Sequence, residues 1–461
     1  MEQKLLVGYA RVDITPEQYT NLGGNGLDAK RMCEKVLDRI YGTCIAITDG
    51  AGETILYCPV DLIHTKYWLA DPARDAMSEA TGVPVDRIMF AASHNHSGPS
   101  VSSPGLDAVK IWFAYFIRQM VKCAKEAMAD RVEAEMQIGQ RNVPKMNFVR
   151  HYYMNDGTVA GPNSGSFASG AKAHLCDRDE QLQVIRFQRK DARDVVMVNW
   201  QCHATISGGT DHMALSGDYI FHMRNHLEGL SGAHFGFFQG AAGNLVPTSR
   251  IEGESILVDT GDGEKMSIGK DAALYGRAMA EQVVECLQGN MVQLPAGPVR
   301  ATVCTFEGQV DHSDDHPAEK AVKVMEEYHK FPYGQRGEAI KQVLRPAGFN
   351  SHLHANGVIN RSKMPETKSM KLWALAVGDV GFITAPYEMF CSNGMYIKAH
   401  SPFSMTFIVT CSNDYNAYMA DDHACNYDIY EINTRHYCRG TAEKLAQTFV
   451  DMLQGLKKEN T

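Results

Sequence analysis

Phe90-Ala-Ala-Ser-His94-Asn-His96-Ser-Gly-Pro99 is the most informative stretch of this sequence, because two histidines follow an apolar run that begins at Arg87. The run and the Ser-Gly-Pro after it predict a buried strand that ends in a turn. Alternate residues of a strand point to the same face, so His94 and His96 could converge on one point. Imidazole is a common metal ligand and a good base near neutral pH, whereas two partly exposed loop histidines are the plain alternative.

Three further apolar runs also lead into side chains that bind metals or move protons. These side chains are His203, Glu388 and Tyr418. Burying a carboxylate such as Glu388 is costly unless it is paired or metal-bound. Since α/β folds bind ligands beyond the ends of their strands, four such strand ends predict a metal cleft. For each residue alone, an ordinary hydrogen-bonded position at a loop edge is the alternative.

Composition narrows the class of protein. The chain has 461 residues, 44% of them hydrophobic, and a formal net charge of -9, which disfavours nucleic acid as a partner. Neither a signal-peptide pattern nor an apolar run long enough to span a membrane is present in the sequence. None of its 12 cysteines form a C-x-x-C pair. This scattered arrangement predicts a reducing, cytoplasmic location. We expect a small-molecule substrate, no membrane partner and a possible homo-oligomer.

Strand-like and helix-like segments mix along the whole chain, without a repeat or a linker. This predicts one α/β domain over residues 1–461, with mixed β-sheets flanked by helices and a polar insert around 310–345. Two long loops rich in small residues, 154–173 and 251–269, are expected to rim the cleft. The predicted strands are 5–15, 43–48, 55–60, 133–140, 181–187, 195–200, 233–238, 372–377, 381–384 and 404–410. The predicted helices are 73–80, 106–131, 218–230, 271–287, 318–329 and 441–456.

Several motifs, in the same order along the chain, resemble the neutral (alkaline, non-lysosomal) ceramidase family. They are Gly8-Tyr-Ala-Arg-Val-Asp-Ile-Thr-Pro16, Ser93-His-Asn-His-Ser-Gly-Pro99, Asn199-Trp200 with His203, and Phe238-Gln239 with Gly243. The similarity extends from about residue 7 to about residue 432. It implies the catalytic-domain fold of that family, without its C-terminal immunoglobulin-like domain, and an amidase site that binds Zn²⁺.

The resemblance also implies roles for individual residues. Matched motif by motif, the zinc ligands are His94, His203, Glu388 and Tyr418. His96 matches a histidine near the scissile carbonyl, and Tyr430 matches a substrate contact. Arg150 matches the arginine of an altered Asn-Arg segment. Where the family carries a serine, this chain has Gly217, and Ser216 is displaced by one position, which turns its side chain to the opposite face of an extended segment.

The predicted function is therefore hydrolysis of an amide (N-acyl) bond in a small soluble substrate by a zinc-activated water. His96 or Asp218 would accept the proton of that water. Tyr430 or Arg150 would hold the substrate or the oxyanion. The alternatives are an esterase, lactonase or sugar deacetylase with the same site, and a non-catalytic, metal-stabilised protein that binds a small molecule.

Overall fold

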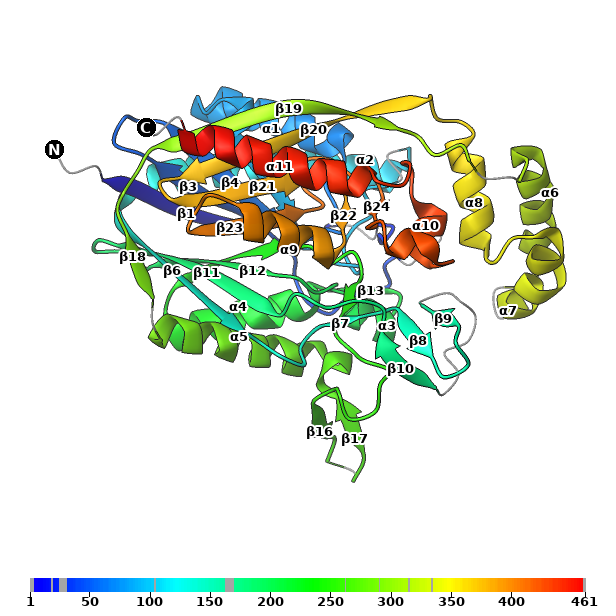
Figure 1. Ribbon diagram of the computed structural model, residues 1–461. Coiled ribbons are helices and arrows are strands. Elements are labelled where there is room, and N and C mark those ends of the chain that lie inside the picture. The colour runs from blue at the N-terminus through cyan, green and yellow to red at the C-terminus, as the bar shows by residue number, and fades with distance from the viewer. Residues whose placement is uncertain are drawn as a thin grey trace.

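Two β-sheets pack face to face at the centre of the protein (Figure 1). The computed structural model describes residues 4–17, 20–24, 31–102, 105–161, 170–261, 263–289, 291–313, 316–332 and 335–458. Within these ranges the larger sheet runs in the order β14 (His234–Gln239), β12 (Val195–Trp200), β11 (Gln181–Arg189), β6 (Val132–Asn142), β1 (Leu5–Asp13), β3 (Tyr41–Thr48), β4 (Thr54–Val60) and β5 (Ile88–Ala92), with β18 (Val292–Leu294) beside β6. The smaller sheet runs β19 (Val299–Gln309), β20 (Thr367–Val377), β21 (Val380–Ala385) and β23 (Met405–Thr410).

Alternation along each strand divides its side chains between two cores. In β1, Val7 faces the core between the sheets, whereas Val12 faces a core beneath helices. Between the sheets, Phe238 of β14 meets Phe407 of β23 with ring centroids 5.9 Å apart, and Phe382 of β21 packs edge-on against Phe407. Apolar side chains on both faces explain why the strands appear as nearly continuous apolar runs in the sequence.

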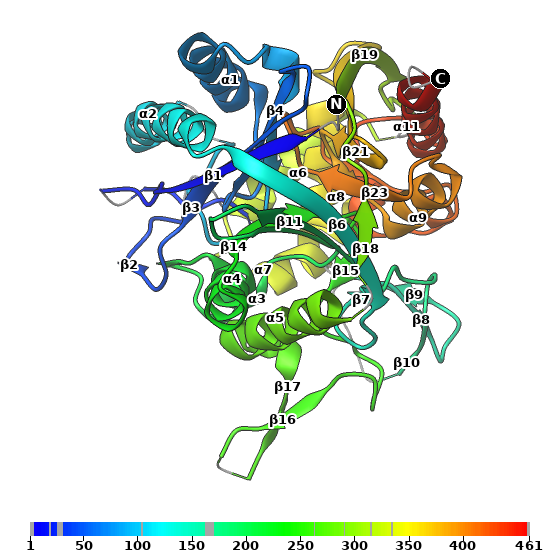
Figure 2. The same cartoon turned by 90° about the vertical axis from the view of Figure 1, so that its left-hand side faces the viewer.

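Helices cover both outer faces, which completes an αββα sandwich (Figure 2). The helices on the larger sheet are α1 (Tyr67–Thr81), α2 (Asp107–Ala129), α4 (Asp218–Ser231) and α5 (Ala272–Gln288). Those on the smaller sheet are α9 (Cys391–His400) and α11 (Thr441–Lys458). The predicted mixed α/β class is confirmed. Helix α1 begins before the predicted residue 73 and contains Pro72 inside it, so the proline does not mark its start.

The polar insert projects from one end of the sandwich (Figure 1). Its helices α6 (Ala318–His329), α7 (Arg336–Ala339) and α8 (His352–Arg361) enclose a small apolar cluster that includes Met325, Leu344 and Val358. This cluster extends past the predicted limit near residue 345. A single domain over residues 1–461 stays a prediction. Among the described helices, none combines the length and apolar character that crossing a bilayer requires.

Short elements connect the layers. They are β2 (Lys35–Val36), η1 (Val85–Arg87), β7 (Phe148–Val149), β8 (Tyr152–Met154), β9 (Val159–Ala160), β10 (Ala171–His174), α3 (Ile206–Thr210), β13 (Ala214–Leu215), β15 (Leu245–Val246), β16 (Leu257–Asp259), β17 (Lys265–Ser267), η2 (Ile268–Lys270), η4 (Ile340–Leu344), η5 (Arg345–Ala347), β22 (Glu388–Met389), β24 (Tyr418–Met419), η6 (Ala424–Asn426) and α10 (Tyr430–Thr434).

The strands that carry the candidate ligands are tied together at their carboxyl ends. Strands β12 and β14 are parallel, and the amide of Asn199 at the end of β12 donates to the carbonyls of Phe238 in β14 and Ile408 in β23. The amide nitrogen of Phe90 in β5 donates to the side chain of Asn413, which follows β23. These bonds bring the ends of strands from both sheets to one place.

Candidate metal centre

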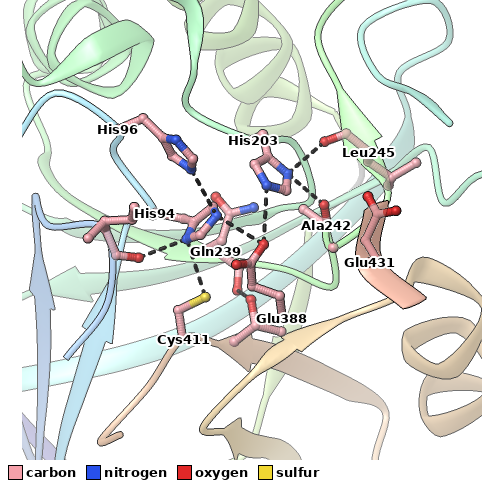
Figure 3. Close-up of polar contacts among 12 residues, drawn as sticks. His94, His96, His203, Gln239, Ala242, Leu245, Glu388, Cys411 and Glu431 are labelled. Carbon is pink, nitrogen blue, oxygen red and sulfur yellow. Dashed lines mark hydrogen bonds and ion pairs between the residues drawn. The ribbon is translucent and has the colours of Figure 1, made fainter. Parts of the chain in front are cut away.

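Three histidines from two strand ends converge at this place (Figure 3). One ligand atom from each of His94, His96 and His203 lies within 4.8 Å of the others. His94 follows β5 and has a left-handed backbone with φ of 58°, which a non-glycine residue adopts only where its surroundings enforce it. The Nε2 atoms of His94 and His96 are 3.2 Å apart. The pairing of Asn95 with Ala204 joins the two strand ends.

Backbone carbonyls orient two of the three imidazoles. Nδ1 of His94 lies 2.7 Å from the carbonyl of Ile63, and Nδ1 of His203 lies 2.7 Å from that of Ala242 and 3.0 Å from that of Leu245. A carbonyl only accepts hydrogen bonds, so each Nδ1 is a donor. Nε2 is then the ring atom that each histidine turns toward the cluster, as in metal sites where a ligating histidine donates its other ring nitrogen to a carbonyl.

Glu388 of β22 places a carboxylate oxygen beside two of the histidines, so that Nε2 of His94, Nε2 of His203 and Oε2 of Glu388 lie together. Its Oε2 lies 3.2 Å from Nε2 of His94 and 3.2 Å from Nε2 of His203. Two ligands placed ~2.1 Å from a tetrahedral ion are roughly 3.4 Å apart, which this spacing fits. Oε2 of Glu388 and Nε2 of His203 are buried and make no hydrogen bond of normal geometry within the described part of the chain. The cluster therefore has the donor atoms that a metal site needs, and two of these buried atoms have no hydrogen bond of normal geometry from the described residues that would compete with a metal.

The electrostatic environment of the cluster favours a positive charge on His94 and a negative charge on Glu388. Burial alone would lower the pKa of His94, but neighbouring Cys411 and Glu388 raise it well above the usual range. Burial alone would raise the pKa of Glu388, but His94 and His203 hold it well below its usual range. These two directions favour an imidazolium at His94 beside a carboxylate at Glu388, and a metal bound to Nε2 of His94 would displace the proton on that nitrogen. Burial, helped by the Arg150 cation, lowers the pKa of His203 to about 4.

Tyr418 lies beside Glu388, because β22 and β24 are parallel and these two residues pair. The Tyr418 ring is 5.3 Å from the ring of Tyr430, at the start of α10. The guanidinium of Arg150 lies 5.5 Å from the Tyr418 ring and 5.7 Å from the Tyr430 ring. The structure thus gathers Arg150, Tyr418 and Tyr430 next to the cluster. Ligation by Tyr418 stays a prediction.

A buried carboxylate holds Arg150 in position. Nε of Arg150 donates to Oε1 of Glu431 at 2.7 Å, and Nη2 donates to the carbonyl of Gly243 at 2.8 Å. Nε2 of His151 lies 2.7 Å from Oε2 of Glu431. Burial would raise the pKa of Glu431, but Arg150 and His151 lower it to about 2. Glu431 is therefore an anion at neutral pH and orients the arginine.

Asp218 and Ser216 have other partners. The carboxylate of Asp218 accepts hydrogen bonds from the amides of Ser207 and Tyr219, each at 2.7 Å, and burial raises its pKa to about 6. The hydroxyl of Ser216 donates to Asp38 at 2.5 Å. Within the described ranges, no hydrogen bond or ion pair joins either side chain to the three histidines. A proton-accepting role for Asp218 stays a prediction.

Sequence reasoning missed the residues that support Glu388. The hydroxyl of Tyr415 donates to Oε1 of Glu388 at 2.6 Å, and the ring of His64 stacks on Tyr415 with centroids 4.2 Å apart. Sγ of Cys411 lies 3.4 Å from Nδ1 of His94. Only Tyr415 carried a signal in the sequence, since it shares a polar turn with Tyr418. The sequence alone does not indicate which of the two tyrosines contacts the carboxylate.

Two pockets adjoin this region. One, of about 460 Å³, is lined by Tyr430 and by Gly157, Val159 and Gly161 of the 154–173 loop. The other, of about 490 Å³, is lined by Arg150 and by Gly269 at the end of the 251–269 loop. Both predicted rim loops thus border pockets that contain a candidate site residue. Residues 162–169 and 262 of these loops lie outside the described residues.

Comparisons with known proteins agree on the fold. The structure is similar to that of neutral ceramidase from Pseudomonas aeruginosa, with a TM-score of 0.72, 16% sequence identity, and coverage of 100% of this chain and 75% of that one. It is also similar to a ceramidase complexed with C2, with a TM-score of 0.69, 15% identity, and coverage of 100% and 76%. No family model and no curated protein matches the sequence. The chain has a neutral ceramidase-like fold, as the sequence motifs implied.

Proposed function

We propose that this protein is a zinc-dependent hydrolase that cleaves an amide bond in a small soluble substrate. The observation that carries the proposal is the convergence of Nε2 of His94, Nε2 of His203 and Oε2 of Glu388, with Oε2 lying 3.2 Å from each nitrogen. Two imidazoles and one carboxylate are a set of protein ligands typical of catalytic zinc. The ceramidase-like fold supports hydrolysis of an amide.

The fourth ligand in this proposal is Tyr418, because strand pairing places it beside Glu388. When bound, zinc would polarise the carbonyl and lower the pKa of water toward ~7. His96 is the least buried of the three histidines, and its Nε2 lies 3.2 Å from Nε2 of His94. We assign His96 as the acceptor of the water proton in preference to Asp218, whose carboxylate is bonded to two backbone amides.

Arg150 and Tyr430 would bind the substrate carbonyl. The bonds from Arg150 to Glu431 and to the Gly243 carbonyl hold the guanidinium in place before substrate arrives. Donors held in this way stabilise the negative charge that develops on the carbonyl oxygen, at no cost of reorganisation. Ser216 has no part in this mechanism, because its hydroxyl is bonded to Asp38.

A sugar deacetylase using the same residues is the second candidate. Asn350, Asn426 and Asn433 line the pocket that contains Tyr430, and such amides suit a ligand rich in hydroxyl groups. An esterase or lactonase would use the same centre, whereas a metal-stabilised binding protein would hold a ligand without turnover. We also propose a cytoplasmic location, which the free state of all 12 cysteines supports.

Elemental analysis of the purified protein, followed by a screen of N-acyl and ester substrates, tests the proposal. We expect about one zinc per chain and hydrolysis of an N-acyl compound. A His203→Ala variant should lose both the metal and the activity. Hydrolysis by metal-free protein, or full zinc content in this variant, would refute the proposal. Bound zinc without turnover of any substrate would favour the alternative of a metal-stabilised protein that binds a small molecule and does not catalyse a reaction.

A further inference from the structure

The pocket lined by Arg150 contains three cationic side chains. Arg150, Arg250 and Lys270 all line this cavity of about 490 Å³, and among its described lining residues none is acidic. Arg250 and Lys270 are exposed, whereas Arg150 is almost buried. The buried Glu431 carboxylate pairs with Arg150 and offsets its charge, so the positive potential of the pocket comes chiefly from Arg250 and Lys270. The electrostatic potential in this pocket therefore favours a negatively charged ligand group.

The same pocket adjoins the candidate metal centre at two points. The guanidinium of Arg150 lies 5.5 Å from the ring of Tyr418, which pairs with Glu388. Val246, in the pocket lining, follows Leu245, whose carbonyl lies 3.0 Å from Nδ1 of His203. A substrate with its amide at the centre would reach this pocket with one of its two halves.

We propose that this pocket binds an anionic group, a carboxylate or a phosphate, on one half of the substrate. The inference rests on the proposed function, because it assigns the substrate class of that site. Arginine binds carboxylate and phosphate through charge-assisted hydrogen bonds that can be bidentate, and lysine adds a point charge. Hydroxyls of Thr205 and Thr248 in the lining supply further donors. An uncharged acyl chain would use none of these groups.

Matched substrate pairs test which half carries the charge. Succinyl-p-nitroanilide against butyryl-p-nitroanilide places a carboxylate on the acyl half, and N-acetylglycine against N-acetylethylamine places it on the amine half. We expect kcat/KM to favour the charged member of one pair by about tenfold or more. The Arg250→Gln/Lys270→Gln variant should lose this preference through a rise in KM for the charged member.

A charge-matched control is Lys265→Gln/Arg277→Gln, which removes two exposed cations that do not line the pocket. It should keep the preference. Equal kcat/KM within both pairs, or a preference that survives in Arg250→Gln/Lys270→Gln, would overturn the inference while leaving the hydrolase intact.

Calorimetry on metal-free protein separates this inference from the proposed function. Succinate, N-acetylglycine and inorganic phosphate are titrated separately, which distinguishes a carboxylate on either half from a phosphate. Binding to the wild type that is lost in Arg250→Gln/Lys270→Gln, but kept in the control variant, supports the anionic pocket even if no substrate is hydrolysed. Absence of binding by all three anions would overturn it.

Discussion

Arg150 and Glu431, 281 positions apart in the chain, form a buried ion pair in which Nε of the arginine donates to Oε1 of the carboxylate at 2.7 Å. The Glu431 side chain is completely buried, and that of Arg150 is 11% exposed. The pair joins the loop after β7 to α10 and holds a cation next to the candidate metal centre. It therefore links the stability of the fold to the position of a proposed substrate-binding group.

Glu431→Gln should destabilise the protein strongly, because it leaves the guanidinium of Arg150 buried without a counter-ion. Removal of one partner from such a pair costs about 3–5 kcal/mol of unfolding free energy. Urea denaturation measures the loss. Glu285→Gln is the control, since it breaks a much more exposed pair with Arg141 and should cost less than about 1 kcal/mol. Similar losses in the two variants would show that Glu431 is not essential for stability.

The pH dependence of stability should contain a component from Glu431. Its pKa falls from 4.5 to about 2 on folding, so the folded state favours the anion. A lowered acid pKa contributes stability that is fully present above pH 4.5 and is lost as the pH falls toward 2. Denaturation in the presence of a chelator, between pH 3 and pH 6, should therefore show a steeper acid loss for the wild type than for Glu431→Gln. Equal slopes would contradict the assignment.

Removal of the metal should abolish activity and lower the melting temperature, since a ligand that binds only the folded state stabilises it. Treatment with a chelator should abolish the activity and lower the melting temperature. Addition of zinc afterwards should restore both. His203→Ala should respond to neither treatment. His226→Ala is the control, because His226 lies partly exposed on α4 and pairs with Glu281. Unchanged melting of the wild type after chelation would exclude a stabilising metal.

Tyr415→Phe should weaken metal binding while the fold is retained. The variant deletes the hydroxyl that donates to Oε1 of Glu388 at 2.6 Å, and loss of a hydrogen bond that orients a metal ligand typically costs about 10- to 100-fold in metal affinity. Competition with a chromogenic zinc chelator measures the affinity. Tyr396→Phe removes an exposed hydroxyl bonded to Gln447 and should have no effect. Wild-type affinity in Tyr415→Phe would show that Glu388 is oriented without the tyrosine.

Ser216→Ala should keep activity within about tenfold, a change of roughly 1.4 kcal/mol or less in the barrier. The hydroxyl of Ser216 is bonded to Asp38 and is not needed for attack on a carbonyl in the proposed mechanism. His96→Ala should cost ~100- to 10,000-fold, which is typical for loss of a general base. Rates of both variants on one confirmed substrate decide between the mechanisms. Comparable losses would indicate a serine-dependent reaction.

The sequence by itself determined most of the long strands, although not β19, and the residues at their ends. Periodicity, and turn formers such as Gly98 and Pro99, depend on neighbours a few positions away, so β5 and the approach to His94 could be predicted locally. The order of the motifs indicated the ceramidase-like fold. The apolar cluster of the insert extends past residue 345, and Pro72 lies inside α1 instead of before it. Both differ from expectation, because tertiary packing overrides local signals.

Only the tertiary structure decided how these ends meet and what supports them. Alternation in a strand shows that a face is buried, but not against which layer, so the stacking of the two sheets could not be predicted. The support of Glu388 by Tyr415 and the pairing of Arg150 with Glu431 both cross between elements distant in sequence. Such contacts depend on how whole layers pack, and a local sequence pattern contains no information about that packing.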